Sequence, residues 1–329
     1  MTTQRKVIAL SAGGDNDELA DQGIGIEHIN ELMVRFSMRL LRDGNRLSFG
    51  GTLGNPDEPL TQTLIDTAIT WLDDEIADEA DPLDPKSNKK KEDASDTKKT
   101  NPSDPKTWPL INYSGWPYFT FVDDKTRASH VGICHFVNVP PENVSSEELK
   151  TLKEEWESKP VARRRNADSL TLMRRLSAKE ADLRIVWGGK IHGAKGWMAG
   201  ILEEVAITLE EGKPLLLLGG FGGCAKLIAK FLSDEGERWP SELNLQATSD
   251  SERENLLSTI EKKLLRERFD EVKSNLEKFR KKLHSKKLVN GISNEALFQG
   301  LTDTSPRQIV RLGSEVARSL AVTKKTKKK

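Results

Sequence analysis

The sequence predicts an α/β protein with a Rossmann-like parallel sheet and helices on both of its faces. Short apolar runs alternate with amphipathic helical patterns through most of residues 6–231, and this alternation is typical of a parallel sheet. Four of the runs end in paired glycines, in SAGGD, SFGGT, VWGGK and LGGFGG. Right-handed crossovers bring the carboxyl ends of such strands to one edge of the sheet, so the glycines are expected to gather there.

The first part of the chain predicts two units of strand, glycine pair and helix. Residues 6–14, KVIALSAGG, form a short apolar run that is typical of a buried strand. Residues 25–44 carry an apolar stripe at helical spacing and end in Gly44, where a helix C-cap is expected. Residues 45–54 predict the second strand, and residues 60–72 predict the second amphipathic helix.

A charged segment interrupts this pattern. Residues 74–105 are rich in Asp, Glu and Lys, contain several prolines and have almost no large apolar side chains. Such a segment cannot bury enough apolar surface to offset the entropy of ordering it. We therefore expect a mobile insertion.

The strand–helix alternation resumes after the insertion. On the helix at residues 169–181 we expect Leu170, Met173 and Leu176 to point inward. The predicted elements are strands at 108–119 and 127–139, a short helix at 169–181, a strand at 182–189, a helix at 197–212, and a last strand and helix within 214–231.

The predicted strands end before Trp239. Residues 252–288 are charged and helical in pattern, and residues 293–320 predict two further short helices. The sequence thus predicts a Rossmann-like domain at residues 1–238 and a helical C-terminal appendage with a basic tail at residues 239–329.

Composition limits the classes of function. Lys and Arg number 51, Asp and Glu number 51, and the formal net charge is +0, which does not favour nucleic acid as a partner. The 2 cysteines show no metal-ligand spacing and no disulfide framework. No run reaches the length of a membrane span or of the core of a signal peptide. We expect a cytoplasmic protein without metal, cofactor or membrane contact.

The four glycine pairs allow two interpretations. The carboxyl edge of an open α/β sheet is where ligands bind, and backbone N–H groups beside a helix N-terminus suit a phosphate. The alternative is that glycine only makes tight turns there, although Asn, Asp or Ser also serve in turns. We favour a nucleotide or another phosphate-bearing ligand.

Charged residues occur near these strand ends. Arg174 and Arg175 precede the third glycine-ended strand and offer the forked guanidinium that suits phosphate, although a pair of surface arginines is the alternative. Glu203 and Glu204 follow a glycine-containing loop, where a carboxylate can bind ribose, act in acid–base chemistry or favour the helix dipole. The chain has no Walker A motif, no nucleophile elbow and no spaced dinucleotide fingerprint.

Five stretches carry a resemblance to a known superfamily. They are ALSAGGDNDEL, RLSFGGTLG, DSLTLMRRLSAKEADLRIVWGGK, GWMAGILEEV and PLLLLGGFGG. Together they resemble the SLOG superfamily of Rossmann-like proteins, which includes the lysine-decarboxylase-like or LOG proteins, DprA-like domains and SLOG sensor domains. The resemblance covers roughly residues 5–73 and 110–235.

The resemblance implies one of two roles. Enzymes of the superfamily hydrolyse the N-glycosidic bond of nucleoside 5′-monophosphates with an Arg-Lys pair and a P-G-G-x-G-T-x-x-E loop, whereas sensors bind nucleotide-derived signals such as ADP-ribose-like molecules. By position, Arg174 and Arg175 match the basic pair and Glu203 or Glu204 matches the glutamate. Trp187 replaces the proline, the second basic residue is Arg rather than Lys, and the loop is longer.

These departures favour a sensor of a nucleotide or ADP-ribose-type signal in a bacterial stress or antiphage system. Its output would lie in a separate effector protein or in its own oligomerisation, and a homodimer is implied by the resemblance. The alternatives are a phosphoribohydrolase, in which Glu203, Glu204 and Arg174 would be catalytic, and an interaction scaffold with a vestigial pocket. The expected ligand-binding residues are Ser11, Gly13, Gly14, Asp15, Asn16, Gly50, Gly51, Thr52, Arg174, Arg175, Gly188, Gly189, Lys190, Gly196, Met198, Gly200, Glu203, Gly219, Gly220, Phe221, Gly222 and Gly223.

Overall fold

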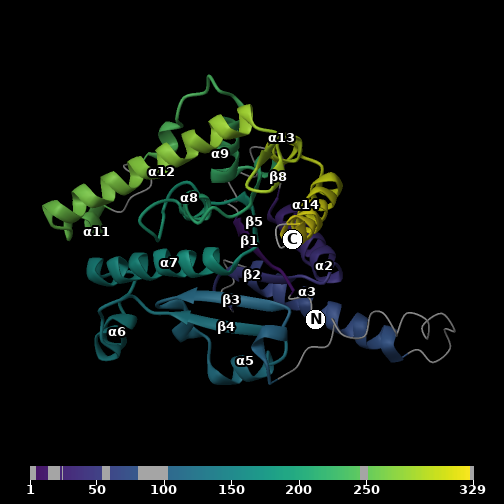
Figure 1. Ribbon diagram of the computed structural model, residues 1–329. Coiled ribbons are helices and arrows are strands. Elements are labelled where there is room, and N and C mark those ends of the chain that lie inside the picture. The colour runs from purple at the N-terminus through teal and green to yellow at the C-terminus, as the bar shows by residue number, and fades with distance from the viewer. Residues whose placement is uncertain are drawn as a thin grey trace.

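A computed structural model gives the structure of the chain (Figure 1). It describes residues 5–13, 23, 25–53, 60–80, 103–244 and 251–326. Within these ranges, six parallel strands form one sheet in the order β4-β3-β2-β1-β5-β6. The strands are β1 (Val7–Gly13), β2 (Arg46–Gly50), β3 (Leu110–Gly115), β4 (Cys134–Val139), β5 (Leu183–Gly188) and β6 (Leu215–Leu218).

The strand order explains where a ligand can enter. The chain runs outward from β1 through β2 and β3 to β4, and then returns to place β5 on the other side of β1. The direction of winding reverses between β1 and β5, and such a switch point leaves a crevice at the carboxyl edge of the sheet. Gly13 at the end of β1 pairs with Gly188 at the end of β5, so two glycine-ended strands meet at this point.

Helices cover both faces of the sheet, as the sequence predicts. Alternate residues of a strand point to opposite faces, and β5 shows both. Trp187 stacks on Phe36 of α2 with ring centroids 5.6 Å apart, whereas Arg184 reaches Ser177 of α7 and Glu204 of α8. The long helices of this α/β unit are α2 (Ile26–Arg42), α3 (Leu60–Ala80), α7 (Pro160–Glu180), α8 (Gly200–Glu210) and α9 (Gly223–Ser233).

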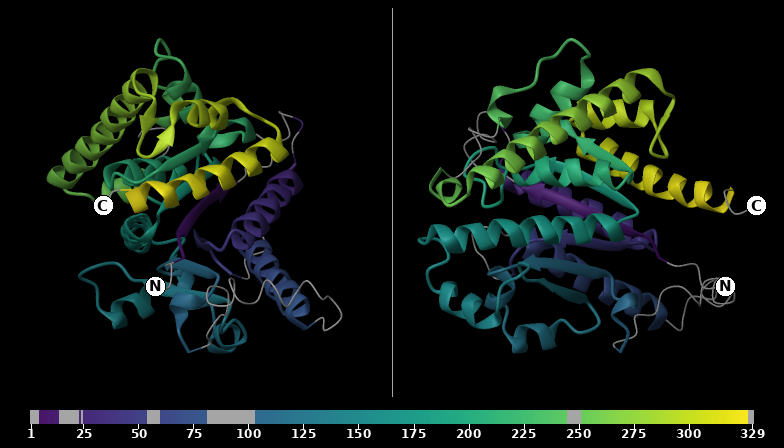
Figure 2. Two further views of the ribbon diagram at one scale, coloured as in Figure 1. Left: turned by 45° about the vertical axis from the view of Figure 1, so that its right-hand side comes forward. Right: turned by 60° about the vertical axis from the view of Figure 1, so that its left-hand side comes forward.

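The C-terminal helices pack onto this α/β unit. Helix α12 packs against α8 and α9, α13 packs against β6 and α9, and α14 lies beside α2 (Figure 2). Their apolar residues belong to the same hydrophobic cluster as the strands. The division at residue 238 stays a prediction, but the helices beyond it share the core of the sheet. Their bounds are α11 (Ser251–Asn255), α12 (Thr259–Ser285), α13 (Asn294–Thr302) and α14 (Pro306–Thr326), with a hairpin of β7 (Leu288–Val289) and β8 (Ile292–Ser293).

Some predicted elements differ from the observed ones. The helix expected at 169–181 is the second half of α7, and Leu176, expected inward, is 42% exposed because the buried stripe continues through Ser177. The segments at 108–119 and 127–139 are strands only in β3 and β4. Between them lie the 3-10 helix η2 (Tyr118–Phe121) and the short helix α5 (Asp124–Ser129), and α6 (Ser146–Lys153) follows β4.

The charged insertion is only partly within the described residues. Helix α3 continues to Ala80, past the expected start of the insertion at residue 74, and the chain is described again from residue 103. The remainder of the predicted mobile segment, residues 81–102, lies outside the described residues.

Candidate functional site

A cavity of about 300 Å³ lies at the switch point, which is within the range of small-molecule pockets. It is formed by the carboxyl ends of β1, β2, β3 and β5 together with parts of α7 and α8 and the loop between β5 and α8. The lining residues are Ala12, Gly13, Ile26, Gly50, Gly51, Thr52, Leu60, Thr61, Ser114, Gly115, Tyr118, Leu170, Met173, Arg174, Gly189, Lys190, Gly193, Ala194, Lys195, Gly200, Ile201 and Glu204.

The floor of the cavity is backbone because glycine is required there. A Cβ atom on Gly13 would lie 3.2 Å from the Cα of Gly189, so the two chain segments could not approach as closely with side chains present. Gly189 itself has a φ of +90°, a region that residues with a Cβ rarely adopt. The glycines therefore leave room and expose peptide groups to whatever occupies the cavity.

Three helices begin at this cavity. The lining includes Ile26 in the first turn of α2, Leu60 and Thr61 in that of α3, and Gly200 and Ile201 in that of α8. The N-cap residue of α8 is Ala199, whose side chain makes no capping hydrogen bond. The first N–H groups of a helix need external acceptors and carry partial positive charge. The cavity therefore has the backbone features of an anion site.

Arg174 brings a guanidinium to the same wall. It lies on α7, is 8% exposed and donates from Nη1 to Oε2 of Glu203. Its Nε is 3.6 Å from Oε1 of Glu204. Gly200 makes room for it, because a Cβ there would lie 2.9 Å from Nη2. Within the described part of the chain Nη2 has no hydrogen-bond acceptor, so it can donate to a ligand.

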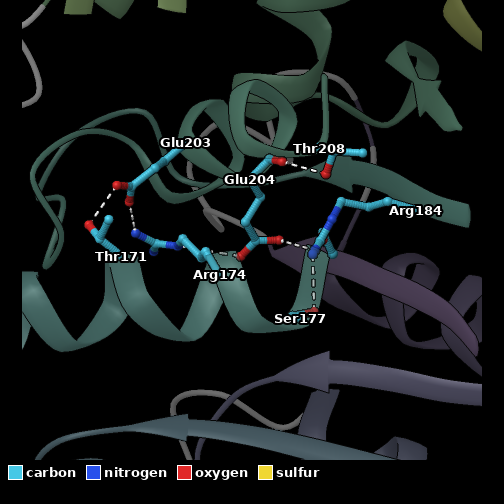
Figure 3. Close-up of polar contacts among 8 residues, drawn as sticks. Thr171, Arg174, Ser177, Arg184, Glu203, Glu204 and Thr208 are labelled. Atoms are coloured by element: carbon cyan, nitrogen blue, oxygen red, sulfur yellow. Dashed lines mark hydrogen bonds and ion pairs between the residues drawn. The ribbon is translucent and has the colours of Figure 1, made fainter. Parts of the chain in front are cut away.

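Arg174 belongs to a buried network of charges between α7, α8 and β5 (Figure 3). Oε1 of Glu203 accepts a hydrogen bond of 2.6 Å from the Thr171 hydroxyl. Glu204 accepts a bond of 2.9 Å from Nη1 of Arg184, which is 3% exposed. Two carboxylates thus face two guanidinium groups, which is the compensation that buried charges need.

Arg184 anchors this network to the sheet. It donates to the Ser11 hydroxyl on β1 at 2.6 Å and to the Ser177 hydroxyl on α7 at 3.1 Å. Burial lowers the pKa of Arg184, and the adjacent carboxylate of Glu204 opposes that shift. Ser11 therefore contacts Arg184 beneath the cavity and does not line it.

The structure brings many of the predicted site residues together. Gly196 supports Arg174 from behind, since a Cβ there would lie 2.7 Å from Nη1. Glu203 positions the same guanidinium without lining the cavity, and Met198 is buried behind the wall. The predicted residues that line the cavity are Gly13, Gly50, Gly51, Thr52, Arg174, Gly189, Lys190, Gly200 and Glu204.

Other predicted residues lie elsewhere. Arg175 is exposed on α7 and does not line the cavity, because it faces away from the buried stripe that contains Arg174. Gly188 packs against the backbone of Gly13. Gly14, Asp15 and Asn16 lie outside the described residues.

The expectation that all four glycine pairs line one pocket is wrong for the fourth pair. Gly219 and Gly220 lie in the 3-10 helix η3 (Gly219–Phe221), where a Cβ would meet the backbone of Leu301 or Asp303. Gly223 packs in the same way against the backbone of Gly188. These glycines, with Phe221 and Gly222, allow the chain after β6 to pack closely on its neighbours, and they do not line the cavity.

The sequence interpretation missed the contribution of β3. Ser114 and Gly115 at its end line the cavity together with Tyr118, which follows them. The signal was present in NYSG, a strand pattern that ends in a single glycine rather than in a pair. Lys195, in the loop before α8, was missed as well.

The fold and the site define a doubly wound, Rossmann-like protein with a glycine-floored cavity at its switch point. A family model described as SLOG cluster2 matches residues 2–80 and 89–298. The chain therefore belongs to the SLOG family, and membership suggests a nucleotide-related function. No curated protein sequence matches the chain.

No described helix is long and apolar enough to cross a membrane. No group of three or more His, Cys, Asp or Glu side chains in the described ranges could hold a metal ion.

Proposed function

We propose that the cavity binds the phosphate of a nucleotide or an ADP-ribose-type molecule, and that the protein is a sensor of this ligand. The observation that carries the proposal is that Arg174 and the uncapped start of α8 face the same glycine-floored cavity. Guanidinium groups and helix N-termini both bind phosphate through directed N–H donors and positive charge.

The charge of the lining supports an anionic ligand. Arg174, Lys190 and Lys195 line the cavity, and Glu204 is the carboxylate among the described lining residues. The partial positive charges of the helix N-termini add to this excess of cations.

The carboxylates favour sensing over hydrolysis. A general base needs a lone pair directed at the reacting group. Glu203 is 2% exposed and is held by Thr171 and Arg174. Glu204 lies between Arg174 and Arg184. Both carboxylates are thus engaged in neutralising buried arginines. A sensor of this kind would act through a separate effector protein or through its own oligomerisation.

Hydrolysis of a nucleoside 5′-monophosphate is the second candidate, and one observation favours it. Glu204 lines the cavity beside Arg174, so a carboxylate and a phosphate-binding group meet at one site. In that reaction Glu204 would assist the attack of water on the ribose carbon as the N-glycosidic bond breaks.

A ligand screen tests the proposal. The melting temperature is measured with AMP, ADP-ribose and cyclic ADP-ribose, with adenosine as the control that lacks phosphate. We expect a concentration-dependent rise for at least one phosphorylated compound, because a ligand that binds only the native state stabilises it, and no rise for adenosine. If none of these compounds raises the melting temperature, the nucleotide proposal fails and the scaffold interpretation gains support.

Chromatography of the same mixtures separates the two candidates. A sensor releases no free base on prolonged incubation. Release of adenine from AMP by the wild type, abolished in Glu204→Gln while AMP still binds, would replace the sensor proposal with the hydrolase.

The role of Arg174 in binding phosphate is tested by replacing both Arg174 and Glu203, its partner in the buried ion pair. The double variant Arg174→Gln/Glu203→Gln leaves no unpaired buried charge, and we expect it to lose affinity for AMP by about ten-fold to a hundred-fold, the value of a charge-assisted hydrogen bond. Arg175→Gln is the matched control on the same helix and should bind as the wild type does. Equal loss in the two variants would mean that Arg174 does not contact the phosphate.

A further inference from the structure

The two ends of the cavity differ in chemistry. At the end formed by β1 and β5 lie Arg174 and the start of α8. At the end formed by β2 and β3 the wall is mixed, because the apolar side chains of Leu170 and Met173 lie there with the hydroxyl groups of Thr52, Thr61 and Ser114. A Cβ on Gly50 would lie 3.1 Å from Cε of Met173. A Cβ on Gly115 would lie 2.9 Å from Oγ of Ser169 and 3.4 Å from Cδ2 of Leu170, so the side chains of α7 cover the ends of β2 and β3. A ligand that fills the cavity meets the Arg174 guanidinium at one end, and apolar, aromatic and hydroxyl groups at the other.

Two aromatic rings pack together beside the β3 end of the cavity. Tyr118 lines the cavity directly after β3 and packs edge-to-face against Trp156, with ring centroids 5.3 Å apart at an angle of 73°. Trp156 lies in the segment between α6 and α7 and is half-buried. The two rings are therefore in contact, with Tyr118 in the lining of the cavity and Trp156 packed against it outside the lining.

A cation covers this surface in the structure. Nζ of Lys195 lies 5.3 Å from the ring centroid of Tyr118 and 5.5 Å from that of Trp156. Lys195 also lines the cavity. The loop that carries it is tied to α7 by a hydrogen bond of 2.9 Å from Nε1 of Trp197 to Asp168. Cation–π contacts of this kind at a partly exposed site are weak, so a better partner for the rings can displace the ammonium.

We propose that Tyr118 and Trp156 form the base-binding subsite of the cavity, where the nucleobase of the ligand stacks in place of the Lys195 ammonium. This inference rests on the proposed function, because it assumes that the phosphate lies at the Arg174 end. A flat base stacks well on aromatic side chains, and Lys195 moves from the rings toward the negative charge of the ligand. The ligand class is therefore a nucleotide that retains its base, not a sugar phosphate.

Two probes that differ only in the base test the subsite. AMP and ribose 5-phosphate share the phosphorylated ribose, and their dissociation constants are measured by calorimetry on the full chain. The variants are Trp156→Leu, Trp156→Phe, which keeps a flat ring, and Phe121→Leu as a matched control. Phe121 lies in η2 with Tyr118, has its own lysine at 5.3 Å (Lys153) and does not line the cavity.

We expect Trp156→Leu to weaken AMP binding by about ten-fold, the loss that follows from removing a stacked ring, and to leave ribose 5-phosphate unchanged. Trp156→Phe should recover most of the loss, and Phe121→Leu should match the wild type. Equal AMP affinity in the wild type and Trp156→Leu overturns the subsite and leaves the proposed function intact. Parallel loss for AMP and ribose 5-phosphate also overturns it, because the effect then does not depend on the base. Failure of the wild type to bind AMP, ADP-ribose and cyclic ADP-ribose overturns the proposed function, and this inference with it.

Discussion

Arg174 shows how one side chain can serve both folding and binding. Its Nη1 donates to Glu203, whereas Nη2 has no acceptor in the described part of the chain, and the residue lines the cavity. The sequence offered two adjacent arginines, and the place of Arg174 beside the expected buried stripe favoured it as the phosphate ligand. Their places on the helix decide it, because the buried stripe runs through Leu170, Met173, Arg174 and Ser177 and leaves Arg175 in solvent. Ser177 continues the stripe with a polar side chain, whose hydroxyl accepts a hydrogen bond from Arg184. The sequence pattern did not reveal this contact.

The buried pair gives a stability prediction. Arg174→Gln leaves the carboxylate of Glu203 buried with the Thr171 hydroxyl as its remaining described partner, and removing one member of a buried ion pair costs about 3–5 kcal/mol of unfolding free energy. Arg174→Gln/Glu203→Gln should recover most of that loss, because two neutral amides can hydrogen-bond. Urea unfolding measures both. A double variant less stable than the single one would show that the two residues are not coupled as described.

The first turn of helix α12 is joined to helix α7. Its start is fixed by a capping box, in which Glu261 accepts hydrogen bonds of 2.8 Å from both the backbone N and the hydroxyl of Ser258. Glu261 also pairs with Arg164 of α7, so the cap joins two helices. The sequence predicted a charged helix here, but it could not show that the helix packs on α8 and α9, because that partner choice depends on residues far away in the chain.

This cap predicts a pH dependence. The hydrogen bonds from Ser258, and then the pair with Arg164, hold the pKa of Glu261 below its ordinary value of 4.5. A lowered pKa means that the stabilisation is complete above 4.5 and is lost as the pH falls through the lower native value. The urea midpoint of Glu261→Gln should lie below that of the wild type at pH 7, and the difference should shrink under acid conditions.

Glu267→Gln is the matched control on the same helix, since its exposed carboxylate lies 3.6 Å from Nζ of Lys263 and caps nothing. It should leave the midpoint nearly unchanged at neutral pH. A difference between the wild type and Glu261→Gln that stays constant down to acid pH would contradict the assigned role of the carboxylate.

At the scale of the whole molecule, the sheet and the C-terminal helices share one core. Phe269 and Leu276 of α12, Leu301 of α13 and Leu312 of α14 belong to the cluster that contains the strands. Alternating patterns predicted the parallel sheet correctly, and glycines from three of the four predicted pairs line the cavity at its carboxyl edge. They did not predict how far the later helices cover the sheet, because a helical stripe shows that one face is buried and not against which partner.

The shared core predicts the behaviour of a truncated chain. A protein ending at residue 238 would expose apolar surface of β6, α8, α9 and α2, and we expect it to lose the cooperative thermal unfolding of the full chain, as followed by near-ultraviolet circular dichroism. If the truncated protein unfolds cooperatively at nearly the same temperature, the later helices are an appendage, as the sequence suggested.

The most direct test of the central claim is a crystal structure of the protein with AMP. We expect the phosphate to lie within hydrogen-bond distance of Nη2 of Arg174 and of the first backbone N–H groups of α8, with the base toward Tyr118. A phosphate bound at any other surface, with this cavity empty under conditions where AMP raises the melting temperature, would contradict it.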